Sequence, residues 1–475
     1  MKQTRFLSWI PWILLLFCSV FYVSLIFNQN VWMDDAFTAS LIRTDMSGVI
    51  SRSMQDTLPP LYNILLKLMT EALGYLVPVM KLTSVIPMVC TLLLGATVVR
   101  KRHGLLTGCI WMLALTCMPL MLNFGVEIRM YSLGFFFATA SGVYAYEVVC
   151  ESRPKNWILF TLFSVLAGYT HHFAFVTAGT VYFFLLLYYL IKDRAHIRRW
   201  FLCVLATAVL YLPCLLTTLK QIGRVSGYFS MPEVTFSVFL KYLIYPYITG
   251  NRVLSVILGL SLLLLFAYGL YRLRTAPSAS LVYALLCVLP YYIVLLFGAV
   301  VSKIMTANIF VDRYLYFACG LIWLFFAILI PLLPPLRIKE HSLQWAYPAI
   351  AVILLIGAVT YHDAWKQEYG SDPSEMIAYL DEHVSENDGL LTCTDSEALY
   401  WCLRFYAPGL KLYSTTEDAV NALEAGDAKA VWIAVDDAHT LSDLKGTATG
   451  EITPRPAGVF SFDRYHFTLY EMTLH

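Results

Sequence analysis

Two adjacent carboxylates, Asp34 and Asp35, lie in the stretch VWMDDAFTAS, which directly follows the first long apolar run of the chain. A carboxylate at a membrane surface can take a proton from an attacking hydroxyl group, so either side chain is a candidate general base. The pair could also hold a divalent cation, because such ions prefer oxygen ligands. The plain alternative is a solvated loop beside a membrane span. The position of the pair and the motifs that follow it favour catalysis.

Further polar side chains lie later in this first loop and after later apolar runs. They are Asp56 in DTLPPLY, Glu127, Arg129 and Tyr131 in EIRMYSL, His171 and His172 in YTHHFA, and Arg313 in DRYL. Charged groups close to a membrane are costly and usually face a protein cavity. Carboxylates supply bases, and guanidinium groups bind phosphate through paired hydrogen bonds. Together these residue types indicate the transfer of a group away from a lipid phosphate.

The composition requires a membrane to hold these residues. The chain has 475 residues, of which 59% are hydrophobic and 14% charged, and its mean hydropathy is +0.66. These values exclude an ordinary soluble domain. Since a spanning helix needs about 20 apolar residues, we expect about eleven spans in a multi-pass protein of the plasma membrane. The runs are 7–27, 82–99, 105–122, 131–149, 157–169, 173–191, 201–219, 253–271, 281–301, 314–333 and 343–361.

The orientation follows from lysines and arginines, because basic residues in short loops stay in the cytoplasm. They cluster at alternate ends of the predicted spans, at Lys2, Arg5, Arg100, Lys101, Arg102, Arg153, Lys155, Lys192, Arg194, Arg198, Arg199, Arg272, Arg274, Arg337 and Lys339. This pattern predicts a cytoplasmic N-terminus. It also predicts that the first extracytoplasmic loop, at about residues 28–60, and everything after Tyr361 lie outside.

The segment 363–475 differs from the rest in charge. It has 20 of the 32 acidic residues but 7 of the 33 lysines and arginines, so its net charge is −13 and that of the rest is +14. Strand-like LLTCT, LKLY and AVWIAV alternate with helix-like EALYWCLRFYA and TEDAVNALEA, as in a small α/β sheet domain. We therefore expect an all-α membrane domain at 1–362 and a soluble extracytoplasmic α/β domain at 363–475.

The motifs, taken in order, resemble a known family. WMDDAFTAS, DTLPPLY, EIRMYSL, YTHHFA and DRYL are similar to motifs of bacterial membrane glycosyltransferases of the C-type fold (GT-C), related to protein O-mannosyltransferases and to the lipid A aminoarabinose transferase. The likeness extends over residues 7–333. It implies a GT-C fold and a polyprenyl-phosphate sugar donor. It also implies an acceptor hydroxyl on a protein, glycan or lipid at the outer face of the bilayer.

The resemblance assigns roles residue by residue. The catalytic base maps to Asp34, with Asp35 as its neighbour. The donor-phosphate contacts map to Arg129, Tyr131 and Arg313, and support of the site maps to Asp56, Glu127, His171 and His172. One position departs from the family, because Leu58 stands where the pattern Asp-x-His-Pro-Pro-Leu-Tyr has a histidine. Any role that needs that imidazole is therefore in doubt.

Structural explanations remain open beside these roles. Asp56 could cap a short helix that starts at the following prolines. Glu127 and Arg129 could form an ion pair that fixes their loop, and Arg313 could anchor a helix at the membrane interface. Interfacial histidines beside aromatic residues often have no catalytic role.

We expect an enzyme that moves a sugar from a polyprenyl phosphate to an acceptor hydroxyl and inverts the anomeric centre. No cofactor is implied apart from the divalent cation considered above, and nothing indicates a nucleic-acid partner. A transporter or lipid flippase is the main alternative, and it predicts polar groups near the bilayer midplane. A catalytically silent protein that binds lipid-linked sugar is the second alternative, because of Leu58.

Overall fold

The structure is a computed structural model that describes residues 2–56, 58–228, 233–249, 251–305, 308–338, 341–393, 398–443, 454–462 and 465–473. The chain divides into two compact units. The first consists of Met1–Ser24, Met46–Leu68 and Leu82–His362, and the second of Leu25–Asp45, Met69–Lys81 and Asp363–His475. The second unit thus includes two segments that the expected boundary at residue 362 leaves in the membrane domain.

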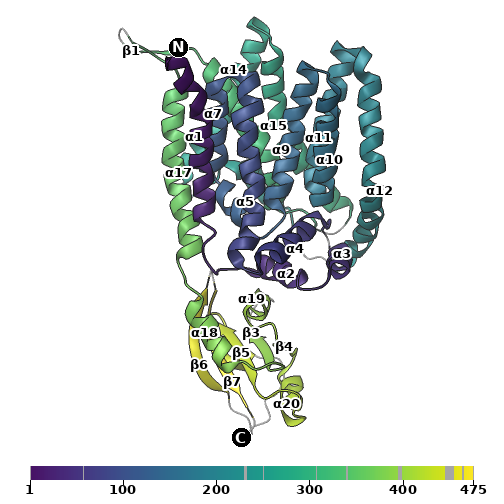
Figure 1. Ribbon diagram of the computed structural model, residues 1–475, viewed down its shortest axis with the longest axis vertical. Coiled ribbons are helices and arrows are strands. Elements are labelled where there is room, and N and C mark those ends of the chain that lie inside the picture. The colour runs from purple at the N-terminus through teal and green to yellow at the C-terminus, as the bar shows by residue number, and fades with distance from the viewer. Residues whose placement is uncertain are drawn as a thin grey trace. The chain divides into compact units, whose positions relative to one another are not determined.

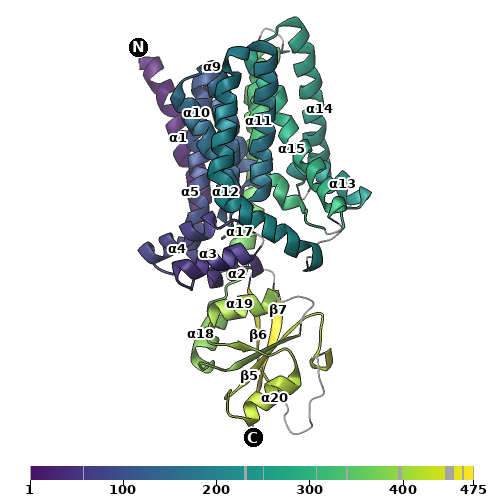
Figure 2. The ribbon, with the colours of Figure 1, turned by 90° about the vertical axis from the view of Figure 1, so that its right-hand side faces the viewer.

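The first unit is a bundle of long helices that run side by side (Figures 1 and 2). They are α1 (Lys2–Ser24), α5 (Val77–Leu94), α7 (Leu105–Cys117), α9 (Tyr131–Cys150), α10 (Pro154–Thr170), α11 (His172–Lys192), α12 (Ile197–Tyr228), α14 (Arg252–Thr275), α15 (Ala279–Ile304), α16 (Tyr316–Leu329) and α17 (Ala346–Tyr369). Each corresponds to one of the apolar runs predicted from the sequence. Nine helices in the described part of the chain are long and apolar enough to cross a membrane. The other two runs form shorter helices, since α7 has 13 residues and α10 has 17.

Residues at the helix ends explain several of these boundaries. Pro154 begins α10, where its missing N–H is not needed. The side chains of Asn251 and Ser278 accept hydrogen bonds from the first turns of α14 and α15. Gly104, with a φ of +97°, makes the turn between α6 (Arg100–His103) and α7, a backbone conformation that suits glycine. Local sequence therefore sets these helix ends.

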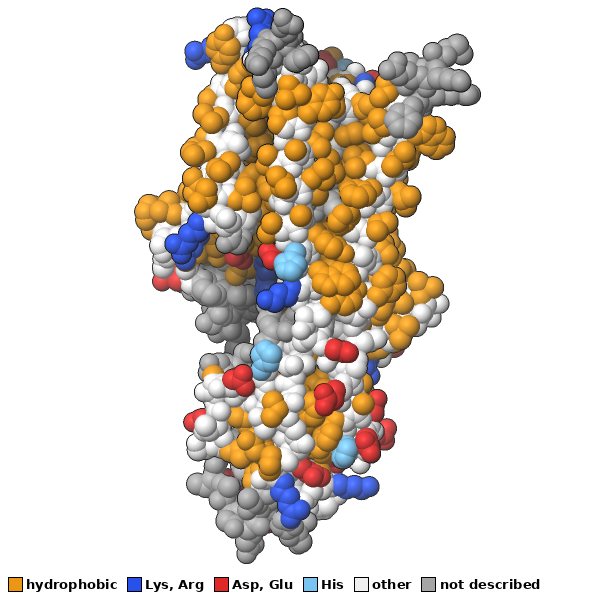
Figure 3. Space-filling view, turned by 90° about the vertical axis from the view of Figure 1, so that its left-hand side faces the viewer, with side chains coloured by type: hydrophobic (Ala, Val, Ile, Leu, Met, Phe, Trp, Pro, Cys, Tyr) orange, Lys and Arg blue, Asp and Glu red, His pale blue; other side chains and the backbone are white. Residues whose placement is uncertain are grey.

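The helices differ in what their side chains face. Every residue of α16 is buried, as expected for a helix that is apolar all round and central in a bundle. It packs closely on α9, where a Cβ atom added at Gly142 would lie 2.5 Å from Leu321. In contrast, α1, α12, α14 and α17 expose many large apolar side chains. Figure 3 shows such side chains over one face of the helical unit, a surface suited to lipid.

Short elements connect the long helices of the first unit. They are α3 (Met46–Gln55), α4 (Leu61–Leu73), η1 (Gly95–Val99), α8 (Met121–Val126), η2 (Arg194–His196), α13 (Phe236–Leu243), η3 (Tyr245–Tyr247), η4 (Asp312–Leu315), η5 (Ile330–Leu332), and the antiparallel pair β1 (Leu336–Ile338) and β2 (His341–Leu343). At the end rich in lysine and arginine, Arg102 forms ion pairs with Glu147 and Glu151, which joins α6 to α9.

The second unit contains a five-stranded sheet with the order β4-β3-β5-β7-β6. The strands are β3 (Gly389–Cys393), β4 (Lys411–Leu412), β5 (Val431–Asp436), β6 (Arg455–Phe462) and β7 (Tyr465–Met472), and the helices are α18 (Ser374–His383), α19 (Ala398–Tyr406), α20 (Thr416–Glu424) and η6 (Leu441–Asp443). β3 pairs in parallel with β4 and β5, while β7 is antiparallel to both β5 and β6. The register of the β6–β7 pair shifts between Pro456 and Gly458. The predicted α/β sheet region is confirmed.

The core of this sheet is apolar, with one buried carboxylate at its edge. Val431 and Ile433 of β5 are fully buried and pack with Ala419 of α20. Asp388, just before β3, accepts hydrogen bonds from the Trp432 indole at 3.1 Å and from the backbone N–H of Ala430 at 3.3 Å. Because a buried carboxylate needs such donors, Asp388 fixes how the chain enters β3 and β5.

The second unit also contains a helix from the N-terminal part of the chain. α2 (Met33–Leu41) packs on α19, and the rings of Phe37 and Trp401 meet edge to face at 5.0 Å. Asp34 and Asp35 lie in the first turn of α2. The C-terminal sheet domain and the acidic pair thus belong to one compact unit.

Candidate active site

The segment from Glu127 to Tyr131 links α8 to α9 in the first unit. The hydroxyl of Ser84, from α5, donates to the Glu127 carbonyl at 2.5 Å and lies 2.9 Å from the Tyr62 hydroxyl. Ser84 is completely buried, so this contact fixes the backbone of the segment. The segment carries Arg129, which is buried and whose Nε atom is inaccessible to solvent.

Tyr131 is completely buried at the start of α9. Its ring lies 5.1 Å from that of Phe124 and 6.2 Å from that of Phe317. The Ser132 hydroxyl donates to the Phe124 carbonyl at 3.0 Å, which ties α8 to α9. Tyr131 thus packs the base of this turn, and a contact between its hydroxyl and a phosphate stays a prediction.

His171 lies between α10 and α11 and caps the second of these helices. Its Nδ1 accepts a hydrogen bond from the Phe173 N–H at 3.1 Å. Its ring is 2% exposed and lies 4.7 Å from the ring of Tyr314 and 4.6 Å from that of Phe317. Residues far apart in the chain therefore meet around this imidazole.

Both candidate arginines influence the electrostatic environment of His171. Burial lowers its pKa well below the usual value, and the positive charges of His172, Arg129 and Arg313 lower it further. The imidazole is therefore neutral near pH 7. The charges of His172, Arg129 and Arg313 thus act on one imidazole, and the roles of these side chains in a site stay predictions.

His172 is linked to Asp56 through Gln221 of α12. The Gln221 amide nitrogen donates to the Asp56 carbonyl at 2.6 Å, and its amide oxygen lies 3.3 Å from His172 Nε2. Gln221 is only 4% exposed. The structure thus joins two predicted support residues through a third that the sequence analysis did not single out.

Arg313 lies in the short helix η4, directly before α16. The Asp312 carboxylate accepts a hydrogen bond from the Arg313 N–H at 2.7 Å, which shapes the turn. Arg313 is half-buried, and its Nε atom is inaccessible to solvent. The next residue, Tyr314, stacks on Phe173 with 5.1 Å between ring centres. These contacts hold the backbone that carries the guanidinium group.

Asp34 and Asp35 belong to the second unit and differ in exposure. Both lie in the first turn of α2, where negative charge is favourable against the helix dipole. Asp34 is half-buried, whereas Asp35 is 3% exposed. Since neighbouring positions in a helix point in different directions, the two carboxylates are not equivalent. Asp34 is the more accessible candidate base.

Comparison with known proteins gives structural matches only. No family model and no curated protein sequence matches the chain. The crystal structure of ArnT from Cupriavidus metallidurans in the apo state matches with a TM-score of 0.63, 11% sequence identity and coverage of 99% of this chain and 98% of that one. The same protein bound to undecaprenyl phosphate matches with a TM-score of 0.61 at the same identity and coverage. An oligosaccharyltransferase from Archaeoglobus fulgidus has a TM-score of 0.48, 11% identity and coverage of 89% of this chain and 68% of that one.

This chain has the same overall fold as the two ArnT structures, which is the fold expected from the GT-C resemblance. The expected resemblance to the aminoarabinose transferase is confirmed at the level of the fold. Because the two ArnT matches cover 99% of the chain, they include the C-terminal sheet region as well as the helices.

Three residues of the helical unit interact with the predicted site residues, although no motif in the sequence singled them out. Ser84 lies within the apolar run 82–99, and Gln221 lies just after the run 201–219. Tyr245 of η3 is the third, since burial and the nearby carboxylates of Asp312 and Glu127 raise its pKa well above 10. An apolar run with one polar residue gives no indication of the contact that this residue makes.

A metal site remains a prediction. Among the residues that the structure describes, no group of three or more His, Cys, Asp or Glu side chains is arranged to hold a metal ion. The divalent cation considered for Asp34 and Asp35 would rest on two carboxylates alone.

Proposed function

We propose that this protein is an integral membrane glycosyltransferase that moves a sugar from a polyprenyl-phosphate donor to an acceptor hydroxyl. Transfer takes place at the extracytoplasmic face and inverts the anomeric centre. Asp34 is the general base, and Arg129 and Arg313 hold the phosphate of the donor.

The observation that carries this proposal is that the turn with Arg313 packs on His171 through Tyr314, with 4.7 Å between the ring centres, and that the charge of Arg129 also acts on this buried imidazole. Arg129 and Arg313 come from segments far apart in the chain, and both act on the pKa of His171. Two arginines that lie near each other can bind one phosphate, because each guanidinium group donates paired hydrogen bonds to its oxygens. The neutral imidazole leaves the arginines as the cations that face this anion.

At the anomeric carbon, the reaction forms one bond and breaks one, and one proton moves from the acceptor to Asp34. The acceptor hydroxyl oxygen attacks the anomeric carbon while its proton passes to the Asp34 carboxylate. The bond from the anomeric carbon to the phosphate oxygen breaks, and the polyprenyl phosphate leaves with the bonding electrons. Negative charge grows on the phosphate during this step, so fixed guanidinium groups stabilise the transition state more than the ground state.

The fold supports the choice of donor. The solved structure of ArnT bound to undecaprenyl phosphate has the same fold over nearly the whole length of this chain. A donor anchored in the bilayer by its hydrocarbon tail also suits a multi-pass protein whose outer helices expose apolar side chains.

We further propose that the N-terminus is cytoplasmic and that the C-terminal domain is extracytoplasmic. Support comes from the lysines and arginines at one end of the helical unit. The plasma membrane is the expected location, because polyprenyl-phosphate donors are used there.

The experiment is a turnover assay with purified protein. A panel of sugars linked to undecaprenyl phosphate is supplied with peptide, glycan and lipid acceptors, and the release of undecaprenyl phosphate is measured. Sugar-dependent release supports a transferase. Movement of lipid-linked sugar across a vesicle bilayer without release supports the flippase alternative.

The matched variants are Asp34→Asn and Asp45→Asn. Asp45 is an exposed acid of the same N-terminal segment, so its variant controls for the loss of one charge. Asp34→Asn should lower turnover by about 10²–10⁴-fold, the contribution of a general base. Full activity of Asp34→Asn would exclude Asp34 as the base.

A catalytically silent protein that binds lipid-linked sugar is the second candidate. One observation favours it, because Leu58 is a buried apolar side chain at the position where the resembled family has a histidine. Such a protein would bind undecaprenyl phosphate and release none from any donor in the panel.

A further inference from the structure

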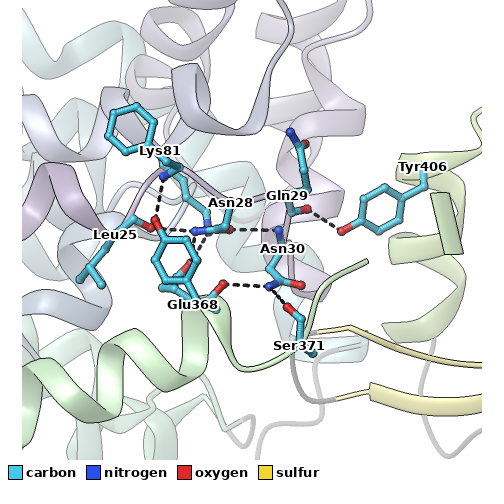
Figure 4. Close-up of polar contacts among 10 residues, drawn as sticks. Leu25, Asn28, Gln29, Asn30, Lys81, Glu368, Ser371 and Tyr406 are labelled. Carbon is cyan, nitrogen blue, oxygen red and sulfur yellow. Dashed lines mark hydrogen bonds and ion pairs between the residues drawn. The ribbon is translucent and has the colours of Figure 1, made fainter. Parts of the chain in front are cut away.

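A buried polar cluster lies inside the second unit, at the segment that leads into α2 (Figure 4). The ammonium group of Lys81, from α5, forms an ion pair with Glu368, from the end of α17. Asn28 completes the cluster, since its amide oxygen accepts from Lys81 at 2.8 Å and its amide nitrogen donates to Glu368 at 3.0 Å. Three segments of the chain therefore meet through charged hydrogen bonds.

Asn30 extends these contacts toward α2. Its amide nitrogen lies 2.8 Å from the Glu368 carbonyl and 2.8 Å from the Ser371 carbonyl (Figure 4). Asn30 is 4% exposed and the Lys81 side chain 2% exposed, so these bonds are shielded from water. Hydrogen bonds of this kind are strong and directional in a low dielectric.

Two further contacts hold the same part of the chain to the C-terminal domain. The Tyr406 hydroxyl of α19 donates to the Gln29 carbonyl at 2.7 Å. At the other end of α2, the Arg43 guanidinium donates to the Phe405 carbonyl at 3.1 Å and lies 4.6 Å from the centre of the Tyr75 ring. The helix that carries Asp34 is thus fixed at both ends by partners within its own unit.

We propose that Glu368 is a positioning residue for catalysis. Through Lys81, Asn28 and Asn30 it fixes residues 28–30, and these fix the first turn of α2, where Asp34 lies. This inference rests on the proposed function and gives the C-terminal domain a task in it, which is to hold the general base in place.

The physical reason is the sensitivity of proton transfer to distance. A general base acts only within hydrogen-bond reach of the proton that it takes. A misplacement of about 1 Å by a change remote from the chemistry can lower a rate about 100-fold. Asn30 precedes Asp34 by four residues, so a shift at Asn30 moves the carboxylate directly.

The first test is Glu368→Gln in the full-length protein, with turnover and binding measured separately. Neutralising Glu368 should lower kcat by about 100-fold and leave the affinity for undecaprenyl phosphate unchanged, because Arg129 and Arg313 belong to the other unit. An unchanged kcat overturns the proposal. A parallel loss of kcat and affinity also overturns it, because it indicates a general structural defect.

The second test does not depend on activity. Hydrogen exchange should show faster deuterium uptake in α2 of Glu368→Gln, with uptake in the core helix α16 unchanged. If the wild-type protein turns over no donor, the proposed function fails, and uptake by α2 still decides whether Glu368 holds this helix. Equal uptake by α2 in the variant and the wild type refutes the positioning role.

Two more variants make the tests specific. Glu382→Gln removes an exposed acid from α18 of the same domain and should leave kcat and uptake at the wild-type values. Tyr406→Phe removes only the hydroxyl that bonds Gln29, and it should shift both readouts in the same direction as Glu368→Gln but less. It serves as the test if Glu368→Gln does not fold.

Discussion

The polar side chains around His171 in the first unit and those around Asn28 in the second differ in how their charges are combined. Around His171, burial lowers the pKa of the imidazole, and the charges of His172, Arg129 and Arg313 lower it further. Around Asn28, one ammonium group meets one carboxylate, and amide groups join them. The first arrangement concentrates positive charge and suits an anionic ligand. The second balances its charges internally and suits a joint between chain segments.

This difference shows that buried charges can serve two purposes in one chain, which are to attract a ligand and to fix the backbone. Like charges that are brought together store unfavourable energy that a bound anion relieves. Opposite charges in fixed geometry define one arrangement of the backbone, since other arrangements would leave a buried charge unpaired. Variants that act on each cluster should therefore change different measurements.

The largest effect is expected for Lys81→Met. This change leaves Glu368 buried without its cation and should destabilise the protein by about 3–5 kcal/mol, measured by thermal unfolding in detergent. The double variant Lys81→Met/Glu368→Leu should recover most of the loss, because it removes both charges. A double variant as unstable as the single one would contradict the ion pair as the cause.

Arg129→Gln and Arg313→Gln should act on the reaction. Each removes a guanidinium group and should lower turnover by about 10²–10³-fold, as for the loss of one group that stabilises developing charge. Binding of undecaprenyl phosphate, measured by titration of the purified protein, should weaken as well. Lys303→Gln, which removes an exposed cation of the same unit, is the control, and an equal effect there would contradict a specific phosphate site.

A smaller effect is expected at Gln221. Gln221→Ala leaves the Asp56 carbonyl and the His172 imidazole without this partner and should cost about 1–3 kcal/mol of stability. Gln221→Glu separates the two contacts, because a carboxylate can accept from His172 but cannot donate to Asp56. Faster hydrogen exchange in residues 46–56 of both variants would show that the bond to Asp56 matters, whereas unchanged exchange would show that it does not.

The smallest effect is a pH dependence from His171. Its pKa is lowered in the folded protein, so below about pH 6.5 the unfolded chain binds a proton that the folded chain does not. The free energy of unfolding should not depend on His171 above that pH. Below it, the free energy of unfolding should fall by up to about 1.4 kcal/mol per pH unit as the pH drops toward the lowered pKa. His171→Asn keeps an N-cap acceptor without this titration and should flatten the slope of melting temperature against pH. An identical slope in both proteins would refute the assignment.

The sequence predicted the helices and strands well, because both depend on local patterns. The predicted apolar runs correspond to the eleven long helices of the bundle, and short apolar runs between helical patterns correspond to β3, β4 and β5. The motifs also singled out His172, Arg129 and Arg313, whose charges act on the pKa of His171, since a charged side chain stands out in an apolar sequence. Their roles in the reaction stay predictions.

The long-range partners could not be predicted. Lys81 directly precedes the apolar run 82–99, and its partner Glu368 is one of 20 acids in the last segment. Nothing local distinguishes these two residues from neighbours that lie in solvent. Likewise, no change in composition marks the packing of α2 on α19, which brings residues 25–45 into the second compact unit. Ion pairs and packing between distant segments depend on tertiary contacts, which a single sequence does not reveal.

The two edges of the C-terminal sheet have a consequence for how the protein meets other chains. One edge, β4, is only two residues long, and the other, β6, contains a proline at the register shift between Pro456 and Gly458. Short edges, prolines and bulges prevent strand addition by a neighbouring polypeptide. The sheet edges therefore disfavour self-association by strand pairing, and an extended peptide would have to be recognised through side chains instead of through backbone pairing.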